Sequence, residues 1–165
     1  MFGANWRATA TECVTEQPCD ALFPDGLSVD RAISIAAPPA TVFGWFCQLR
    51  VAPYSYDLLD NWGKSSPRER DRALADLAVG QRFMNLFTLQ SYVADRHITL
   101  RTPSVSVTYA VAPEAAGSRV HVRVRFGGPR LVGHLIAIGD LVMMRKQLLT
   151  LKELAEGEHS AQRIG

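Results

Sequence analysis

The spacing of hydrophobic positions changes along the chain, and each spacing predicts a different kind of element. From residue 27 to 37 the apolar side chains fall on odd positions, interrupted by Arg31, which predicts a half-buried strand. Later in the chain the same alternation returns and predicts further strands over 82–94, 97–102, 105–111 and 119–126. The links between these later strands are too short for parallel crossovers, so we expect an antiparallel meander.

Other stretches carry helical spacing or helix start signals. Residues 39–49 begin with a proline, which is well placed in a first turn, and continue with an apolar stripe. The Ser-Pro-Arg-Glu sequence at 66–69 has the form of a capping box and predicts a helix over 67–78. Residues 130–157 are rich in helix formers, contain no proline and end at a glycine in a C-cap position, so they predict a long closing helix.

The order of these elements predicts the fold class. Apolar residues nearly encircle the first half of the last helix, which is typical of a helix that protein surrounds or that covers a cavity. A sheet with one apolar face needs a cover, and only this helix is long enough to provide it. We therefore expect an α+β fold in which a curved antiparallel sheet wraps around the C-terminal helix, with two short helices after the first strand. Such curvature can leave a cavity of roughly 300–1,000 Å³, a usual size for a small-molecule site.

The same pattern suggests one domain with two appendages. Residues 1–26 carry no sustained period and are punctuated by proline and glycine, which is typical of a loop or a loosely docked arm. Residues 27–157 contain all the predicted strands and helices and form the expected ligand-binding domain. Residues 158–165 are expected to form a C-terminal tail.

Composition and charge narrow the classes of function. With 165 residues, 47% of them hydrophobic and 21% charged, the chain suits one ordinary globular domain. A formal charge of +2 is too small to favour a nucleic-acid partner. The N-terminus lacks a secretory signal pattern, and the strongest apolar run, 131–144, is broken by His134 and Asp140, so we expect no integral membrane segment and a cytoplasmic location.

Cysteine and histidine spacing predicts neither a metal site nor a cofactor. In the cytoplasm Cys13, Cys19 and Cys47 are expected to remain reduced. Cys13 and Cys19 are close enough in sequence to close a small loop, but no second cysteine or histidine pair has the spacing of a zinc site.

The two faces of the strand 119–126 differ sharply in chemistry. Its valines and Phe126 share one face, and the other face carries Arg119, His121, Arg123 and Arg125. If the valines face the core, the basic side chains lie on the convex surface, where a solvated face is the simpler expectation. The alternative is an anion-binding or partner-binding patch continued by His97 and Arg101.

A few residues break the apolar character expected of the inner face. Tyr109 is one, and its buried hydroxyl needs a hydrogen-bond partner, which a ligand or His134 could provide. His134 is otherwise a core or interface histidine, and Asp140 either bonds to another element or serves as an acid or base with a raised pKa. Phe126 and Met143 complete the expected lining on the strand and the closing helix.

The stretch 53–67, between the two short helices, holds the remaining candidates. Ser66 and Pro67 are explained by helix capping, and the residues from 60 to 63 suit a turn. The side chains left unexplained are Tyr54, Tyr56, Asp57 and Trp62. We expect them to form a lid over a ligand; the alternative is a direct part in its chemistry.

Several of these stretches resemble a known superfamily over residues 28 to 156. They are Ile33-x-Ile35-x-Ala37-Pro38-Pro39-x-x-Val42-Phe43, the sequence AVGQRF at 78–83 and the hairpin at 105–126. They resemble the START-like (SRPBCC) helix-grip proteins, which include bacterial polyketide cyclases and lipid carriers. The stretches 53–61 and 140–156 resemble a polyketide cyclase/dehydrase-like bacterial subgroup. Gln81 stands where that superfamily often has aspartate, a departure confined to a turn.

The resemblance implies a helix-grip fold with a shared cavity and leaves three functions open. The first is binding of a hydrophobic small molecule such as a lipid, a polyketide or an aromatic metabolite. The second is a polyketide cyclase/aromatase or dehydratase that uses Tyr54, Tyr56, Asp57 or His134. The third is a co-chaperone or protein-interaction module that uses the basic convex face. The apolar inner face favours the first two, and the lack of an evident acid–base pair favours binding. A homodimer is compatible with each.

Overall fold

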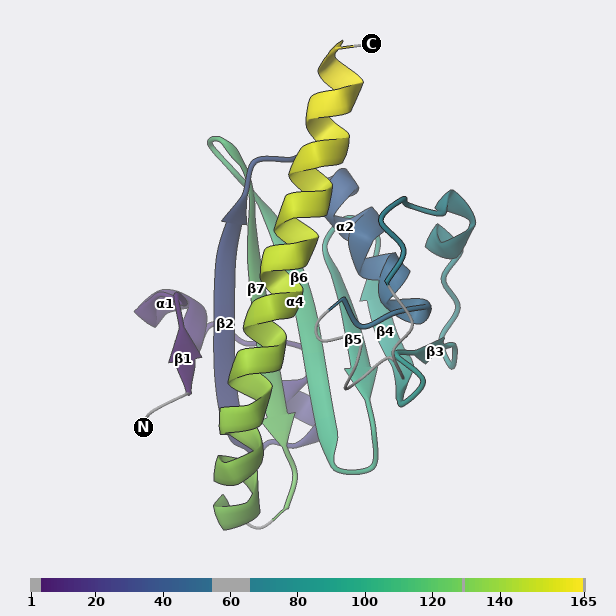
Figure 1. The fold of residues 1–165 in the computed structure, drawn as a ribbon. Helices are drawn as coiled ribbons and strands as arrows, with labels where there is room; N and C mark the ends of the chain where they lie inside the picture. Colours follow the sequence, from purple (N-terminus) through teal and green to yellow (C-terminus); the bar gives the residue numbers. More distant parts are fainter. Residues whose placement is uncertain (1–3, 55–65, 129, 165) are drawn as a thin grey trace.

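The computed structural model describes residues 4–54, 66–128 and 130–164, and for residues 130–142 it describes the backbone alone. The chain is an α+β protein with a seven-stranded, mostly antiparallel sheet and a long C-terminal helix (Figure 1). The strand order is β1-β2-β7-β6-β5-β4-β3. The bounds of the strands are β1 (Asn5–Trp6), β2 (Leu27–Ile35), β3 (Arg82–Phe83), β4 (Phe87–Val93), β5 (His97–Arg101), β6 (Val105–Glu114) and β7 (Gly117–Phe126).

The helices lie against one face of this sheet, except for a short helix near the N-terminus. Figure 1 shows α4 (Arg130–Ile164) running along β2, β7 and β6, with α2 (Pro39–Cys47) beside it. The short helix α1 (Ala10–Val14) lies beyond the β2 edge with β1, which pairs in parallel with β2. Among the described residues, no helix is long and apolar enough to cross a membrane.

The predicted alternation of the meander is confirmed by the register of the strands. Ile98 pairs with Tyr109, and Tyr109 pairs with Val122, so these side chains share the face that α4 covers. All three are at most 1% exposed. The β6–β7 hairpin is longer than expected, because pairing continues to Glu114 and Gly117. Gly117 has φ +144°, and a Cβ there would lie 2.2 Å from the carbonyl oxygen of Ile35, so the turn requires glycine.

The predicted helix over 67–78 is wrong. Within that range the structure has only a 3-10 turn at Arg72–Ala75, capped by the side chain of Asp71. The reason is a tertiary contact: the Gln48 amide donates to the Asp71 carbonyl at 2.9 Å and accepts from the Asp71 N–H at 3.0 Å. These bonds hold the backbone at Asp71 in an extended conformation and override the local capping signal.

Two other predicted boundaries also need correction. The single strand expected over 82–94 is divided into β3 and β4 by a turn in which Met84 and Asn85 have positive φ. The helix expected to stop at Gly157 continues to Ile164, so most of the predicted tail is helical. A glycine inside a helix costs about 1 kcal/mol, which neighbouring contacts can offset, and here the Arg70 side chain bonds to Glu158 in the next position.

The segment before β2, which we call the N-terminal arm (residues 4–26), contains regular elements and is docked against the sheet. It begins with β1 at the β2 edge, continues through α1 and ends in a 3-10 turn at Asp20–Leu22. The helix α1 has a capping box, in which Thr9 accepts from the Glu12 N–H and the Glu12 carboxylate accepts from the Thr9 N–H.

Candidate functional site

The inner site centres on a buried pair of polar side chains from the sheet and from α4. The Tyr109 hydroxyl on β6 donates to Gln147 Oε1 at 2.8 Å, and the sulfur of Met144 lies 3.8 Å from the same hydroxyl. Gln147 in turn donates to the carbonyl of Pro53 and lies 3.6 Å from the sulfur of Met84. Gln147 is only 4% exposed, so this bonding satisfies an amide that burial would otherwise destabilise.

The hydrogen-bond partner of Tyr109 is therefore Gln147, a residue that the sequence analysis missed. Its place in the sequence could have identified it as buried, because it lies three residues after Met144 and four before Leu151. Both of these residues are buried on the face of α4 that packs on the core. A polar residue on that face needs a buried partner, and Tyr109 is the matching donor.

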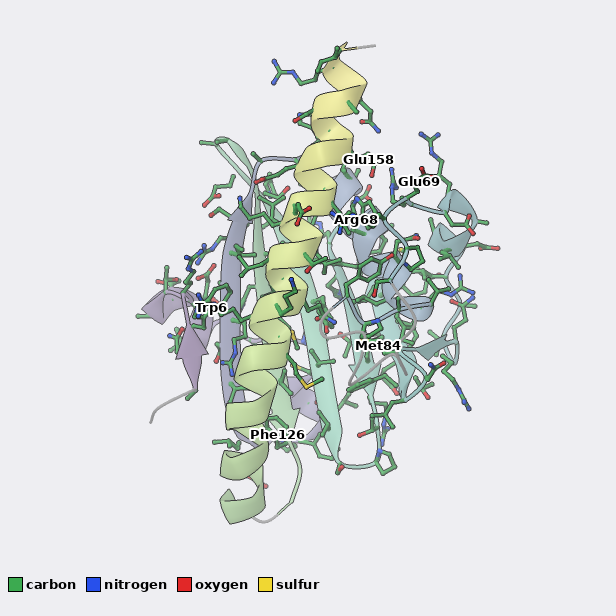
Figure 2. All side chains as sticks on the ribbon, viewed as in Figure 1. Trp6, Arg68, Glu69, Met84, Phe126 and Glu158 are labelled. Atoms are coloured by element: carbon green, nitrogen blue, oxygen red, sulfur yellow. The ribbon has the colours of Figure 1, made fainter. Side chains whose placement is uncertain are left out.

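The other predicted lining residues do not all meet at this pair. Tyr54 is 1% exposed, and its ring packs edge-on against Trp45 with centroids 6.0 Å apart. Phe126 is buried at the far end of β7, and Figure 2 shows it well separated from Met84. Met143 is partly buried on α4.

The structure does not describe the side chains of four further predicted candidates. Tyr56, Asp57 and Trp62 lie outside the described residues. His134 lies on α4, where only the backbone is described.

The surroundings of the pair are apolar. Side chains from α2, the sheet and the middle of α4 form one buried cluster that includes Phe46, Phe83, Leu89, Leu100, Val107, Val122 and Leu148. Cys47 belongs to the same cluster, and burial raises the pKa of its thiol to about 11, which favours the neutral thiol at ordinary pH. Among the described residues no group of histidine, cysteine and carboxylate side chains could hold a metal ion.

The face of the sheet opposite α4 holds a second polar cluster, and the expectation that it is solvated is wrong. The N-terminal arm covers it, so that His121 and Arg123 are 6% and 4% exposed. One oxygen of Asp30 on β2 accepts from Arg123 Nε and from His121 Nε2, each at 2.8 Å. His121 Nδ1 lies 3.1 Å from the amide nitrogen of Gln17 in the arm.

Arg123 anchors the arm with its whole guanidinium group. Besides Asp30, its N–H groups donate to Asp20 and to the backbone carbonyls of Glu12, Cys13 and Thr15, at 2.7–2.9 Å. These contacts use all five donors of the side chain. Glu12 and Cys13 belong to α1, so the cation lies where the carbonyls at the end of a helix favour positive charge.

The neighbouring arginines of β7 also bind the arm. Arg119 donates to both carboxylate oxygens of Glu12, at 2.7 and 2.9 Å, and this lowers the pKa of Glu12 from 4.5 to about 2 against the opposing effect of burial. Arg125 donates to the carbonyls of Phe23 and Pro24. Three cations of the predicted anion-binding or partner-binding patch are thus occupied by the arm. Of the patch's other members, Arg101 is exposed, and burial lowers the pKa of the partly buried His97.

A third feature is an open groove of about 690 Å³ between residues 68–72 and the end of α4, which we call the α4 groove. Arg68 forms an ion pair with Glu153 across it, and Arg70 pairs with Glu158, which also accepts from the indole N–H of Trp45 at 2.9 Å. Gly44 on α2 permits this arrangement, because a Cβ there would lie 2.1 Å from the Arg70 guanidinium. The sequence analysis did not predict this groove.

The fold and these sites define a class of protein by architecture: an α+β domain in which a seven-stranded sheet packs on a long C-terminal helix. No protein-family model matches the chain, and no curated protein matches it. Solved structures do resemble it.

Three of these structures cover most of the chain. The KanY protein, studied in solution by NMR, is 16% identical with a TM-score of 0.55, and the alignment covers 79% of this chain and 98% of KanY. Protein NE0264 from Nitrosomonas europaea is 14% identical with a TM-score of 0.54, covering 81% of this chain and 96% of its own. Protein SSP2350 from Staphylococcus saprophyticus is 16% identical with a TM-score of 0.52, and the alignment covers 76% of this chain and 88% of SSP2350. Likeness at such low identity shows the fold alone.

Proposed function

We propose that this chain is a START-like protein of helix-grip type that binds a hydrophobic small molecule between the sheet and α4. The observation that carries the proposal is the Tyr109–Gln147 hydrogen bond, which lies buried among apolar side chains. Small-molecule sites commonly combine a mostly apolar lining with a few placed polar groups. The resemblance of the sequence to the superfamily supports the same reading.

The chemistry of the pair defines the class of ligand. A carbonyl or hydroxyl oxygen on an apolar molecule can take the Tyr109 hydrogen bond that Gln147 accepts in this structure. Met84 and Met144 border the pair, and their flexible thioethers can move aside at low cost. The proposed ligand is therefore a lipid, polyketide or aromatic metabolite that carries at least one oxygen acceptor.

Binding is proposed rather than the cyclase-type catalysis that the sequence also left open. The described neighbours of the pair supply a hydroxyl, an amide and thioethers. These groups orient a ligand but are poor general acids or bases near neutral pH.

The experiment compares two aromatic probes of similar size, 1-acetonaphthone with a carbonyl and 1-ethylnaphthalene without one. Titration of the purified protein, followed by its tryptophan fluorescence, should give tighter binding of the ketone by about threefold to tenfold, the value of one hydrogen bond. Tyr109→Phe should remove this preference while both probes still bind. Native mass spectrometry of the same preparation would show whether an apolar molecule is retained from the cell.

Tyr92→Phe is the matched control. Tyr92 lies on β4, is 37% exposed and donates to the carbonyl of Leu77 at 2.8 Å, away from the pair. This variant should keep the preference for the ketone. The proposal fails if the wild-type protein binds neither probe, or if the two tyrosine variants behave alike.

A further inference from the structure

The last turns of α4 extend beyond the body of the domain. Figure 1 shows the end of this helix reaching past the sheet and α2. Its side that borders the α4 groove carries Leu154, Gly157 and Ala161, and Ile164 follows at the same helical spacing. Ile164 is 88% exposed, and a Cβ added at Gly157 would meet nothing within 4 Å. A second polypeptide segment therefore has room to approach this side of α4.

The charges around the groove argue against a small anion as the occupant. Arg68 and Arg70 are already paired with Glu153 and Glu158 on α4. Among the described residues only Arg72 is a lining cation without an ion pair, and the lining also includes the acidic Glu69. The wall at residues 68–72 thus presents one unpaired charge of each sign to whatever fills the groove.

The end of α4 itself offers a complementary charge. Glu153, Glu156 and Glu158 pair with Arg68, Lys152 and Arg70 of the same chain, whereas Arg163 follows near the end of the helix. When two such helices lie antiparallel, the basic end of each reaches the α4 groove of the other, which is lined by Glu69. Arg163 makes no ion pair with the described residues of its own chain, so it is available to an acidic residue such as Glu69 on another copy.

We propose that the α4 groove binds the end of α4 from a second copy of this chain, so that two copies form an antiparallel dimer. Each copy inserts its Ile164 end along the Gly157–Ala161 side of the other, and Arg163 of one copy pairs with Glu69 of the other. A twofold arrangement satisfies both grooves at once. The contact involves only three turns of helix and one loop, so the dimer is weak and depends on protein concentration.

The test is sedimentation-equilibrium centrifugation of the full chain over a range of concentrations. The wild-type protein should shift from monomer to dimer as concentration rises. Ala161→Glu places a charge on the groove side of the helix and should raise the dimer Kd at least about tenfold. Ser160→Glu is the matched control, because Ser160 neighbours Ala161 and is exposed but does not line the groove.

A charge exchange then tests the orientation. Glu69→Arg and Arg163→Glu should each weaken the dimer, and the double variant should restore it, because the pair is re-formed with its signs reversed. Circular dichroism should show that all five variants fold, since every substituted residue is exposed. A wild-type protein that stays monomeric at every concentration, equal association of Ala161→Glu and Ser160→Glu, or a double variant no stronger than the single ones would overturn the proposal.

Discussion

One face of the sheet, the helix-covered face, is covered by α2 and α4 mainly through apolar side chains, whereas the opposite, arm-covered face is covered by the N-terminal arm through hydrogen-bonded ions. Both coverings exclude water: Val122 on one face and Arg123 on the other are 0% and 4% exposed. The stabilisation from apolar burial does not depend on bond direction, and an apolar core tolerates substitutions that conserve side-chain volume. An ion network depends on each of its partners, because removal of one leaves another charge buried without compensation.

The two coverings should therefore respond differently to single substitutions. On the arm-covered face, one residue, Arg123, donates to both the sheet and the arm. On the helix-covered face, the described polar contacts include the Tyr109–Gln147 pair and bonds of Lys152 and Glu156 at the end of β2, and the larger part of the cover is apolar.

The largest expected effect is from Arg123→Met, which keeps much of the side-chain volume and removes the charge. It should lower the free energy of unfolding by about 3–5 kcal/mol, because Asp30 is left buried without its cation and several carbonyls of the arm lose their donor. Urea denaturation at neutral pH measures this loss. Arg82→Met on β3 is the control, since Arg82 is exposed and should change stability by about 0.5 kcal/mol or less.

A second substitution separates lost charge balance from lost packing. Asp30→Asn added to Arg123→Met should recover part of the stability, because it removes the uncompensated carboxylate. If Arg123→Met costs no more than Arg82→Met, ions do not hold the arm and the contrast between the faces is wrong.

On the helix-covered face, Tyr109→Phe should lower the free energy of unfolding by about 1–3 kcal/mol, because the Gln147 carbonyl oxygen is left buried without its donor. Thermal or urea unfolding of wild type and variant measures the difference. Tyr92→Phe should cost about 0.5 kcal/mol or less, since water can reach its partly exposed site. Equal losses in the two variants would mean that the Tyr109–Gln147 bond adds nothing specific to the stability of the helix-covered face.

The elements that sequence predicted well are those specified by local pattern. Alternation located β5, β6 and β7 to within a few residues, because a side-chain period of two identifies a half-buried strand regardless of what covers it. The predicted helix at 67–78 failed because its outcome depends on Gln48, which is 23 residues before Asp71. A capping box is worth about 1 kcal/mol, and tertiary hydrogen bonds of similar strength can oppose it.

The arm and the inner pair were harder to predict for a related reason. Arg123 binds backbone carbonyls of Glu12, Cys13 and Thr15, and every residue has such a carbonyl, so no side-chain pattern marks the acceptors. Tyr109 was identified as a residue that needs a partner. Its partner is 38 positions away in sequence, and only the packing of α4 on β6 brings Gln147 to it.

The smallest expected effect concerns pH and the outer edge of the ion network. Arg119 lowers the pKa of Glu12 from 4.5 to about 2 in the folded protein, so this carboxylate stabilises the fold above pH 4.5 and loses that contribution as the pH falls toward 2. Glu12→Gln should therefore be less stable than wild type at pH 7, by about 1 kcal/mol or less for a partly exposed pair. The free energies of unfolding of the two proteins, measured by urea denaturation, should become equal near pH 2. Glu16→Gln, which changes an exposed residue in the same arm, is the control and should alter stability little at either pH. If the stability lost in Glu12→Gln is the same at pH 7 and at pH 2, Glu12 stabilises the fold by packing and not by its charge.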